Sequence, residues 1–215
     1  EYFFGGNESA SLKNRADALS PLVRQGMVAF NDYDAQFVGG SNGFRTGLNE
    51  TEFMTFAFVG KHTAALAELI NNYNNNDPNP AQSATALFFS TSGGGFIGMC
   101  ATTTGVTPNA AFVITPNTDY IAIGRVRVSG ASHELVLNVY RGGVQLASVI
   151  TALPNRQIRA LIELSLGFWV PPAGITHANI NYRAAAIYDR ALSDVETAAL
   201  AAYYRDYYAT RGISI

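Results

Sequence analysis

The stretch NINYRAAAIYDRALSDVETAA, residues 179–199, carries the signals that decide the fold. An alternating segment ends in Ile187-Tyr188, a charged turn follows, and a different pattern begins at Ser193. Ser193 is a favourable helix N-cap, and Glu196 stands three residues later, which is the spacing of a capping box. The stretch therefore predicts a β-strand that leads through a short turn into an α-helix.

The helix is predicted to span residues 193–211, with Gly212 as its C-terminal cap. One face carries a leucine and four tyrosines at helical spacing: Leu200, Tyr203, Tyr204, Tyr207 and Tyr208. A tyrosine stripe could stack on sugars or bases, but the amphipathic spacing favours docking against a sheet or a neighbouring subunit.

The rest of the chain is dominated by period-two alternation bounded by Gly, Asn and Pro, the pattern of β-strands. Single strands are predicted within residues 52–61, 119–130 and 157–166, and a strand pair is predicted within 84–105 around Gly93-Gly94-Gly95. Together with the final helix, this pattern predicts an all-β fold, an antiparallel β-sandwich closed by a C-terminal α-helix.

A β-hairpin is predicted over residues 134–150. Its turn is Gly142-Gly143, since two glycines supply the positive φ that a tight turn needs. Leu135, Leu137 and Val139 alternate toward one face on the first strand, and Val144, Leu146 and Ile150 are expected to return along the second.

Composition supports one sizeable core, because 48% of the 215 residues are hydrophobic and only 14% are charged. The net charge of −2 and the lack of a basic stripe argue against a nucleic-acid partner, and no apolar run reaches the length of a membrane span. The lone Cys100 excludes an intrachain disulfide. We expect a single domain over residues 1–215, with residues 1–30 wrapping the edge of the sandwich.

The segment AAAIYDRALSDVETAAL, residues 184–200, resembles the closing strand and cap of concanavalin A-like, laminin-G-like jelly rolls. In many of those domains the last strand ends in an aliphatic-Tyr pair, followed by Asp or Asn, Arg-Ala-Leu, Ser and a helix-starting Glu. The glycine that usually precedes this strand is replaced here by THANIN, residues 176–181. The entry SNGFRTG, residues 41–47, is similar to modules in tail fibres and other virion proteins of bacterial viruses.

Catalysis has no support in the sequence. Retaining β-glucanases of this fold carry two carboxylates in a Glu-x-Asp-x-x-Glu pattern on one strand, and that pattern is missing. Glu50 and Glu52 have the right alternation but no third acid, so we expect a solvated pair at a loop. The three histidines, His62, His133 and His177, are far apart, and no nucleophile elbow occurs. No catalytic residue is predicted.

Calcium is the one metal that the resemblance suggests, since legume lectins and many laminin-G relatives bind it through Asp and Asn oxygens. Asp32 and Asp34 are weak candidate ligands, and the loop of residues 72–77 could add oxygens. Neither group forms a full ligand set, so no cofactor is predicted.

A carbohydrate site needs an aromatic platform for the apolar face of a sugar and amide or carboxylate groups for its hydroxyls. The candidates are an Asn-rich loop and the single tryptophan: Asn72, Tyr73, Asn74, Asn75, Asn76, Asp77 and Trp169. Asn also builds turns and tryptophan also fills cores, so a purely structural role stays open for each.

These observations predict a non-catalytic jelly-roll module on a virion or extracellular surface that recognises a glycan or a cell-surface receptor. A tail-fibre component of a bacterial virus is the most concrete version, and a start at Glu1 rather than Met predicts a fragment or a processed product. Two alternatives stay open. One is a structural assembly module that forms a homo-oligomer such as a trimer, and the other is a glycoside-active enzyme with atypical carboxylates.

Overall fold

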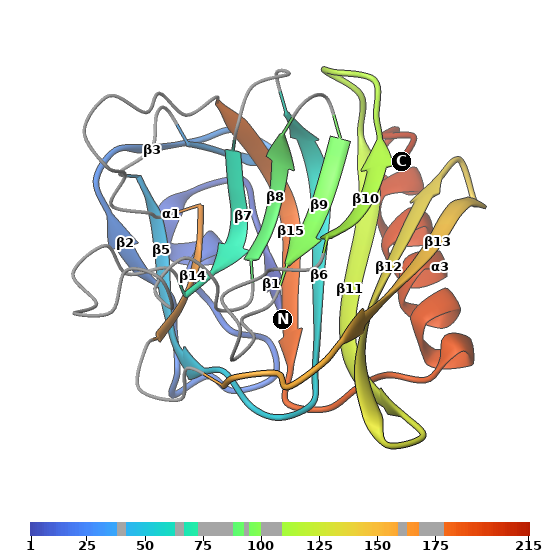
Figure 1. The fold of residues 1–215 in the computed structure, drawn as a ribbon. Helices are drawn as coiled ribbons and strands as arrows, with labels where there is room; N and C mark the ends of the chain where they lie inside the picture. Colours follow the sequence, from blue (N-terminus) through green and yellow to red (C-terminus); the bar gives the residue numbers. More distant parts are fainter. Residues whose placement is uncertain are drawn as a thin grey trace.

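A computed structural model of the chain describes residues 1–37, 42–62, 67–72, 88–92, 95–99, 109–158, 163–167 and 179–215. The described strands form two sheets, and a C-terminal helix lies outside them (Figure 1). The larger, eight-stranded sheet contains β1 (Tyr2–Phe3), β3 (Val28–Phe30), β4 (Ala35–Phe37), β6 (Met54–His62), β11 (Tyr120–Ser129), β12 (Ser132–Arg141), β13 (Val144–Leu153) and β15 (Ile180–Tyr188). The seven-stranded sheet contains β2 (Val23–Gln25), β5 (Gly43–Asn49), β7 (Ala67–Asn71), β8 (Phe88–Ser92), β9 (Gly95–Met99), β10 (Asn109–Val113) and β14 (Glu163–Leu166).

All pairings among these strands are antiparallel. The larger sheet runs in the order β13-β12-β11-β6-β15-β4-β3, and the smaller one in the order β10-β9-β8-β7-β14-β5-β2. β1 pairs with β15 beside β4, so the first strand lies within the larger sheet. β3 is an edge strand of the larger sheet, and β2 is an edge strand of the smaller sheet. The predicted all-β antiparallel sandwich with a C-terminal helix is confirmed.

An aromatic-rich core fills the space between the sheets. The Tyr182 ring meets the ring of Phe37 at 4.7 Å and that of Phe58 at 5.0 Å between centroids, and the Phe37 ring meets Phe44 at 5.1 Å. The Tyr182 hydroxyl donates to the carbonyl of Leu69 in the opposite sheet, which satisfies its polar end inside the core. The core therefore joins strands from both layers through large side chains.

Helix α3 (Asp194–Ala209) covers the outer face of the larger sheet and creates a second core there (Figure 1). Leu200, Tyr204 and Tyr208 are buried against this face, whereas Tyr203 is 46% exposed. The stripe is thus a docking face, as its spacing predicted. Phe3 of β1 also packs into this layer, with its ring 4.3 Å from that of Tyr207.

Both ends of α3 follow from local sequence. Ser193 Oγ accepts from the Glu196 amide at 3.2 Å, and the Glu196 carboxylate accepts from the Ser193 amide at 2.8 Å, which completes the predicted capping box. The helix ends at Ala209 with Thr210 as its cap, so the cap lies two residues before the predicted Gly212. Gly212 instead adopts a φ of +72° in the turn that follows. A short helix, α1 (Glu8–Ser11), lies near the N-terminus.

The predicted hairpin forms between β12 and β13, with Gly142 and Gly143 at φ values of +58° and +78°. Leu146 and Ile150 point to the outer face and are exposed, whereas Leu153 is buried toward the inter-sheet core. A register shift at Val139/Tyr140 changes the pairing next to the turn, which alternation alone does not reveal.

Candidate functional site

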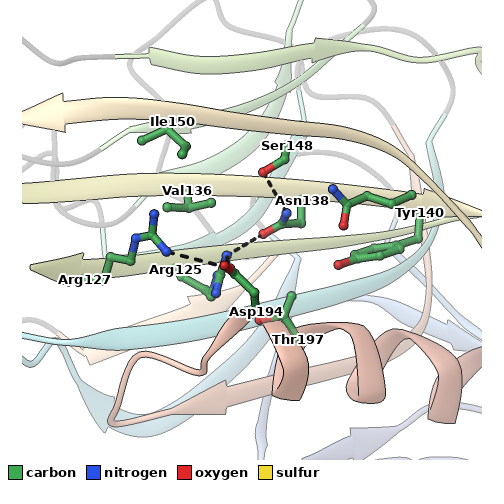
Figure 2. A pocket seen from close by; sticks show the side chains of 10 residues that line it. Arg125, Arg127, Val136, Asn138, Tyr140, Ser148, Ile150, Asp194 and Thr197 are labelled. Atoms are coloured by element: carbon green, nitrogen blue, oxygen red, sulfur yellow. Dashed lines mark hydrogen bonds and ion pairs between the residues drawn. The ribbon is translucent and has the colours of Figure 1, made fainter. Parts of the chain in front are cut away.

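A polar pocket of about 260 Å³ lies between the first turn of α3 and the outer face of β11, β12 and β13 (Figure 2). Most of its lining side chains are polar or charged: Arg125, Arg127, Val136, Asn138, Tyr140, Gln145, Ser148, Ile150, Asp194 and Thr197. Five of these side chains carry an amide or hydroxyl group, and each such group can both donate and accept hydrogen bonds.

The alternation of β11 explains how arginines reach this face. Ile121 and Ile123 point outward under α3, and Arg125 and Arg127 continue the same side of the strand. Val126 points the other way into the inter-sheet core. The outer face therefore changes from apolar beneath the helix to charged beyond it, at the point where α3 begins.

Arg125 is the centre of the pocket, and its side chain is only 1% exposed. Its Nη2 donates to Asn138 Oδ1 at 3.0 Å and to Asp194 Oδ1 at 2.6 Å, and its Nη1 donates to the Leu192 carbonyl at 2.9 Å. One buried guanidinium thus ties β12, the turn before α3 and the helix start together. Figure 2 shows the arginine between Asn138 and Asp194. This arrangement holds the polar groups around it in fixed positions.

Asp194 is 78% exposed although it is bonded to Arg125. Arg127 approaches the same carboxylate oxygen, Oδ1, at 3.7 Å and also meets Glu134 at 3.3 Å. The hydrogen bond from Arg125, together with its positive charge, lowers the pKa of the Asp194 carboxyl. Asp194 is therefore an ionised hydrogen-bond acceptor at neutral pH, with its second oxygen turned toward no described donor.

Asn138 and Ser148 extend the network toward the edge strand. Asn138 Nδ2 donates to Ser148 Oγ at 3.1 Å, which leaves the Ser148 hydroxyl hydrogen available to a ligand. Burial raises the pKa of the Tyr140 phenol, so it stays protonated and can donate. Gln145 is exposed on the same outer face. The pocket thus offers an acceptor and several donors to a hydroxyl-rich ligand.

Of the predicted sugar-binding residues, Asn72 lies away from the polar pocket, and the others lie outside the described residues. Asn72 is 1% exposed, and its Nδ2 donates to Glu50 Oε2 at 3.0 Å. Residues 73–77 and Trp169 lie outside the described residues. The polar pocket was missed because its members are dispersed over three strands and a helix. The available signal was Arg125 and Arg127 on the outward face of a strand otherwise rich in Ile and Val.

The expectation of a solvated Glu50 and Glu52 pair is wrong for Glu50. Its carboxylate is fully buried and meets Arg156 Nη2 at 2.6 Å, and Arg156 also donates to the carbonyls of Thr51 and Glu52. The arginine is 106 positions away in the sequence, so only the fold brings it there. Glu52 itself is exposed, with His133 Nε2 3.4 Å away.

The weak calcium candidates form no cluster within the described ranges. Asp34 Oδ1 accepts from Asn31 Nδ2 at 2.6 Å and from Asn181 Nδ2 at 3.3 Å, and Asp32 is exposed. No group of three His, Cys, Asp or Glu side chains within those ranges could hold a metal ion. His62 has no described side chain, and His177 lies outside the described residues, as does Cys100.

The sequence matches no protein-family model and no curated protein. Solved structures do share the fold. The binding domain of botulinum neurotoxin serotype D has a TM-score of 0.67 at 11% identity, over 94% of this chain and 51% of that one. The binding domain of Paraclostridial Mosquitocidal Protein 1 has a TM-score of 0.66 at 13% identity, over 96% of this chain and 52% of that one. The binding domain of botulinum neurotoxin DC, in complex with SialylT, has a TM-score of 0.65 at 10% identity, over 94% of this chain and 50% of that one.

The chain spans about half the length of each of these domains. At such low identity the similarity shows a shared β-sandwich and nothing finer. Among the described residues, no helix has the length and apolar character needed to cross a membrane.

Proposed function

We propose that the chain is a non-catalytic module that binds glycans through the polar pocket between α3 and β11–β13. The observation that carries the proposal is the buried Arg125, which fixes Asn138 and Asp194 as hydrogen-bonding groups at the wall of an open pocket. Sugars bind where amide, hydroxyl and carboxylate groups are already oriented, because fewer rotamers must then be frozen on binding.

A binding role fits the pocket better than glycoside cleavage. A glycosidase needs two carboxyl groups, one of them protonated to act as the general acid. Asp194 is the single carboxylate among the residues lining this pocket, and its lowered pKa keeps it ionised. Glu50 is buried in its pair with Arg156 and is not among the residues that line this pocket. No acid and base pair is therefore available to a sugar bound there.

The setting of this module is also a proposal. Among the structurally similar proteins, cell entry of botulinum neurotoxin type C is described as dependent on two ganglioside molecules. That description concerns a protein twice as long, so it supports a surface-recognition role without assigning a site. The resemblance of residues 184–200 and 41–47 to jelly-roll and tail-fibre modules supports a virion or other extracellular surface, with residues 1–215 acting as one domain.

A glycan array followed by calorimetry tests the proposal. Gln145→Ala and Ser148→Ala remove two exposed polar groups of the pocket and should weaken binding about tenfold each, since each removes about one hydrogen bond to the ligand. Gln25→Ala is the matched control, because it makes the same chemical change on β2 in the other sheet. Unchanged affinity in both pocket variants would refute the site.

Assembly is the second candidate function, because β13 ends the larger sheet and has no pairing partner on its far side among the described strands. Val144, Leu146 and Ile150 are exposed along this edge strand. Exposed edges of this kind pair with other chains. Native mass spectrometry of the purified chain tests it: a trimer or dimer that Leu146→Lys dissociates would support assembly, and a lone monomer would count against it.

A further inference from the structure

A second cavity of about 250 Å³ adjoins the polar pocket along α3. Tyr140 and Gln145 line both cavities, so the two share a wall. The polar pocket lies at the first turn of the helix, and the second cavity lies beside its middle turns, bounded on the far side by Gly143 of the hairpin turn. The two cavities therefore lie side by side along α3, with Tyr140 and Gln145 between them.

The wall of the second cavity is chemically different from that of the first. Its helical side consists of Ala198, Ala201 and Ala202, and Ile121 contributes from the sheet. None of these side chains can hydrogen-bond. A sugar ring carries a hydroxyl on most of its carbons, and each buried hydroxyl needs a partner. The group that fits against the alanines must therefore bring apolar surface of its own.

Polar groups do flank this apolar wall at both ends. Gln145 and Tyr140 stand at the boundary with the polar pocket, and Arg205 stands at the opposite end, close to Gly143. The Gln145 amide offers one donor pair and one acceptor, the complement of another amide. A substituent that combines a methyl group with an amide matches this arrangement.

We propose that the two cavities form one extended site for an N-acetylated oligosaccharide, with its hydroxyls in the polar pocket and its acetamido methyl group against Ala198, Ala201 and Ala202. This inference rests on the proposed glycan-binding function and names the class of glycan. The acetamido N–H and carbonyl hydrogen-bond with the Gln145 amide, and the acetamido methyl group is buried against the alanines. Neutral sugars that carry a hydroxyl at the same position place an unpaired polar group there.

The experiment measures the binding of matched oligosaccharide pairs by calorimetry: chito-oligosaccharides against cello-oligosaccharides, and N-acetyllactosamine against lactose. In chito-oligosaccharides an acetamido group replaces the C2 hydroxyl of every sugar, and in N-acetyllactosamine it replaces the C2 hydroxyl of the reducing-end sugar alone. The wild-type chain should bind the acetylated member at least about tenfold more tightly, the factor expected from one buried methyl group and one amide hydrogen bond.

Two helix variants locate the effect. Ala198→Leu fills the second cavity from an exposed position and should reduce the preference to about twofold or less, because it weakens binding of the acetylated member more than that of the hydroxyl member. Ala199→Leu is the matched control, since Ala199 is the next residue, is exposed and lines neither cavity. It should leave the preference unchanged. Both substitutions keep helix propensity high, and thermal unfolding verifies that both variants fold.

The outcomes separate the two proposals. Equal binding of both members of every pair, in the wild type and in Ala198→Leu, would overturn the acetamido assignment and leave the glycan site standing. Binding of no member of any pair would overturn the assignment, whereas the glycan array and the Gln145 and Ser148 variants decide the proposed function. Preference lost equally in Ala198→Leu and Ala199→Leu would also overturn the assignment, because the effect would not come from the cavity.

Discussion

Replacing the buried Arg125 by methionine should destabilise the fold more than any other change around the pocket. The Leu192 carbonyl and Asn138 Oδ1 both accept from this guanidinium, and both residues are 5% exposed or less. Without the arginine, each of these acceptors is left unpaired, at a cost of about 1–3 kcal/mol each. Asp194 adds little to the loss because water reaches its carboxylate.

Leaving both acceptors unpaired should lower the free energy of unfolding by about 2–6 kcal/mol. Methionine also removes the cost of burying a positive charge, which brings the expected loss to the lower half of that range, about 2–4 kcal/mol. For a domain of this size, such a loss lowers Tm by about 5–15 °C. Urea unfolding followed by circular dichroism, with the slope of the transition compared between variants, measures it directly.

Arg127→Met is the matched control. Arg127 lies two positions away on the same strand and the same face, but its side chain is 30% exposed and its contacts with Glu134 and Asp194 are 3.3 and 3.7 Å long. Partly exposed pairs of this kind contribute about 0–1 kcal/mol. If Arg125→Met is as stable as the wild type, or if the two variants lose the same amount, Arg125 does not organise this side of the sandwich.

Three further predictions concern other parts of the chain. Glu50→Gln should lower the free energy of unfolding by about 3–5 kcal/mol, because it leaves the Arg156 charge buried without its partner. In urea unfolding, the double variant with Arg156→Met should lose less stability than Glu50→Gln alone, and an equal or larger loss would contradict this. Gly124→Ala should cost about 1–3 kcal/mol, since its Cβ would overlap the buried Phe56 ring; an unchanged Tm would show that the ring can move aside. Hydrogen bonding from the Arg190 side chain helps to lower the pKa of Glu196 to about 2. The contribution of the Glu196 carboxylate to stability is therefore complete above about pH 4.5 and is lost as the pH falls toward 2. The Tm difference between the wild type and Glu196→Gln should shrink over that interval, and a difference independent of pH would refute the assignment.

Local sequence was enough to predict the elements whose determinants lie within a few residues of one another. The capping box of Ser193 and Glu196 is an i, i+3 interaction, and it forms where the spacing placed it. The Gly142-Gly143 turn needs positive φ at two successive residues, and both glycines have it. The docking face of α3 also followed from a 3.6-residue period that every helix shares.

Local sequence could not predict the candidate site or the buried pair of Glu50, because the contacts of both join residues far apart in the chain. Arg125 meets Asp194 across 69 positions, and Glu50 meets Arg156 across 106. Each pairing depends on the register and order of strands, which are set by the whole sandwich rather than by the residues involved. The predicted Asn-rich loop and Trp169 were chosen from residue type alone, and they remain predictions, apart from Asn72, which is buried beside Glu50.

The sequence by itself thus determined the strand pattern, the hairpin turn and the start of the last helix, because backbone geometry and hydrogen bonds over three or four residues dictate them. Only the tertiary structure decided which face of β13 meets the core, since a register shift beside Tyr140 sets its pairing. Only the tertiary structure, likewise, placed α3 so that its first turn meets Arg125 and its alanines face the hairpin. The reason is physical: alternation says that a strand has two faces, but only the packing of both sheets and the helix says which one is covered.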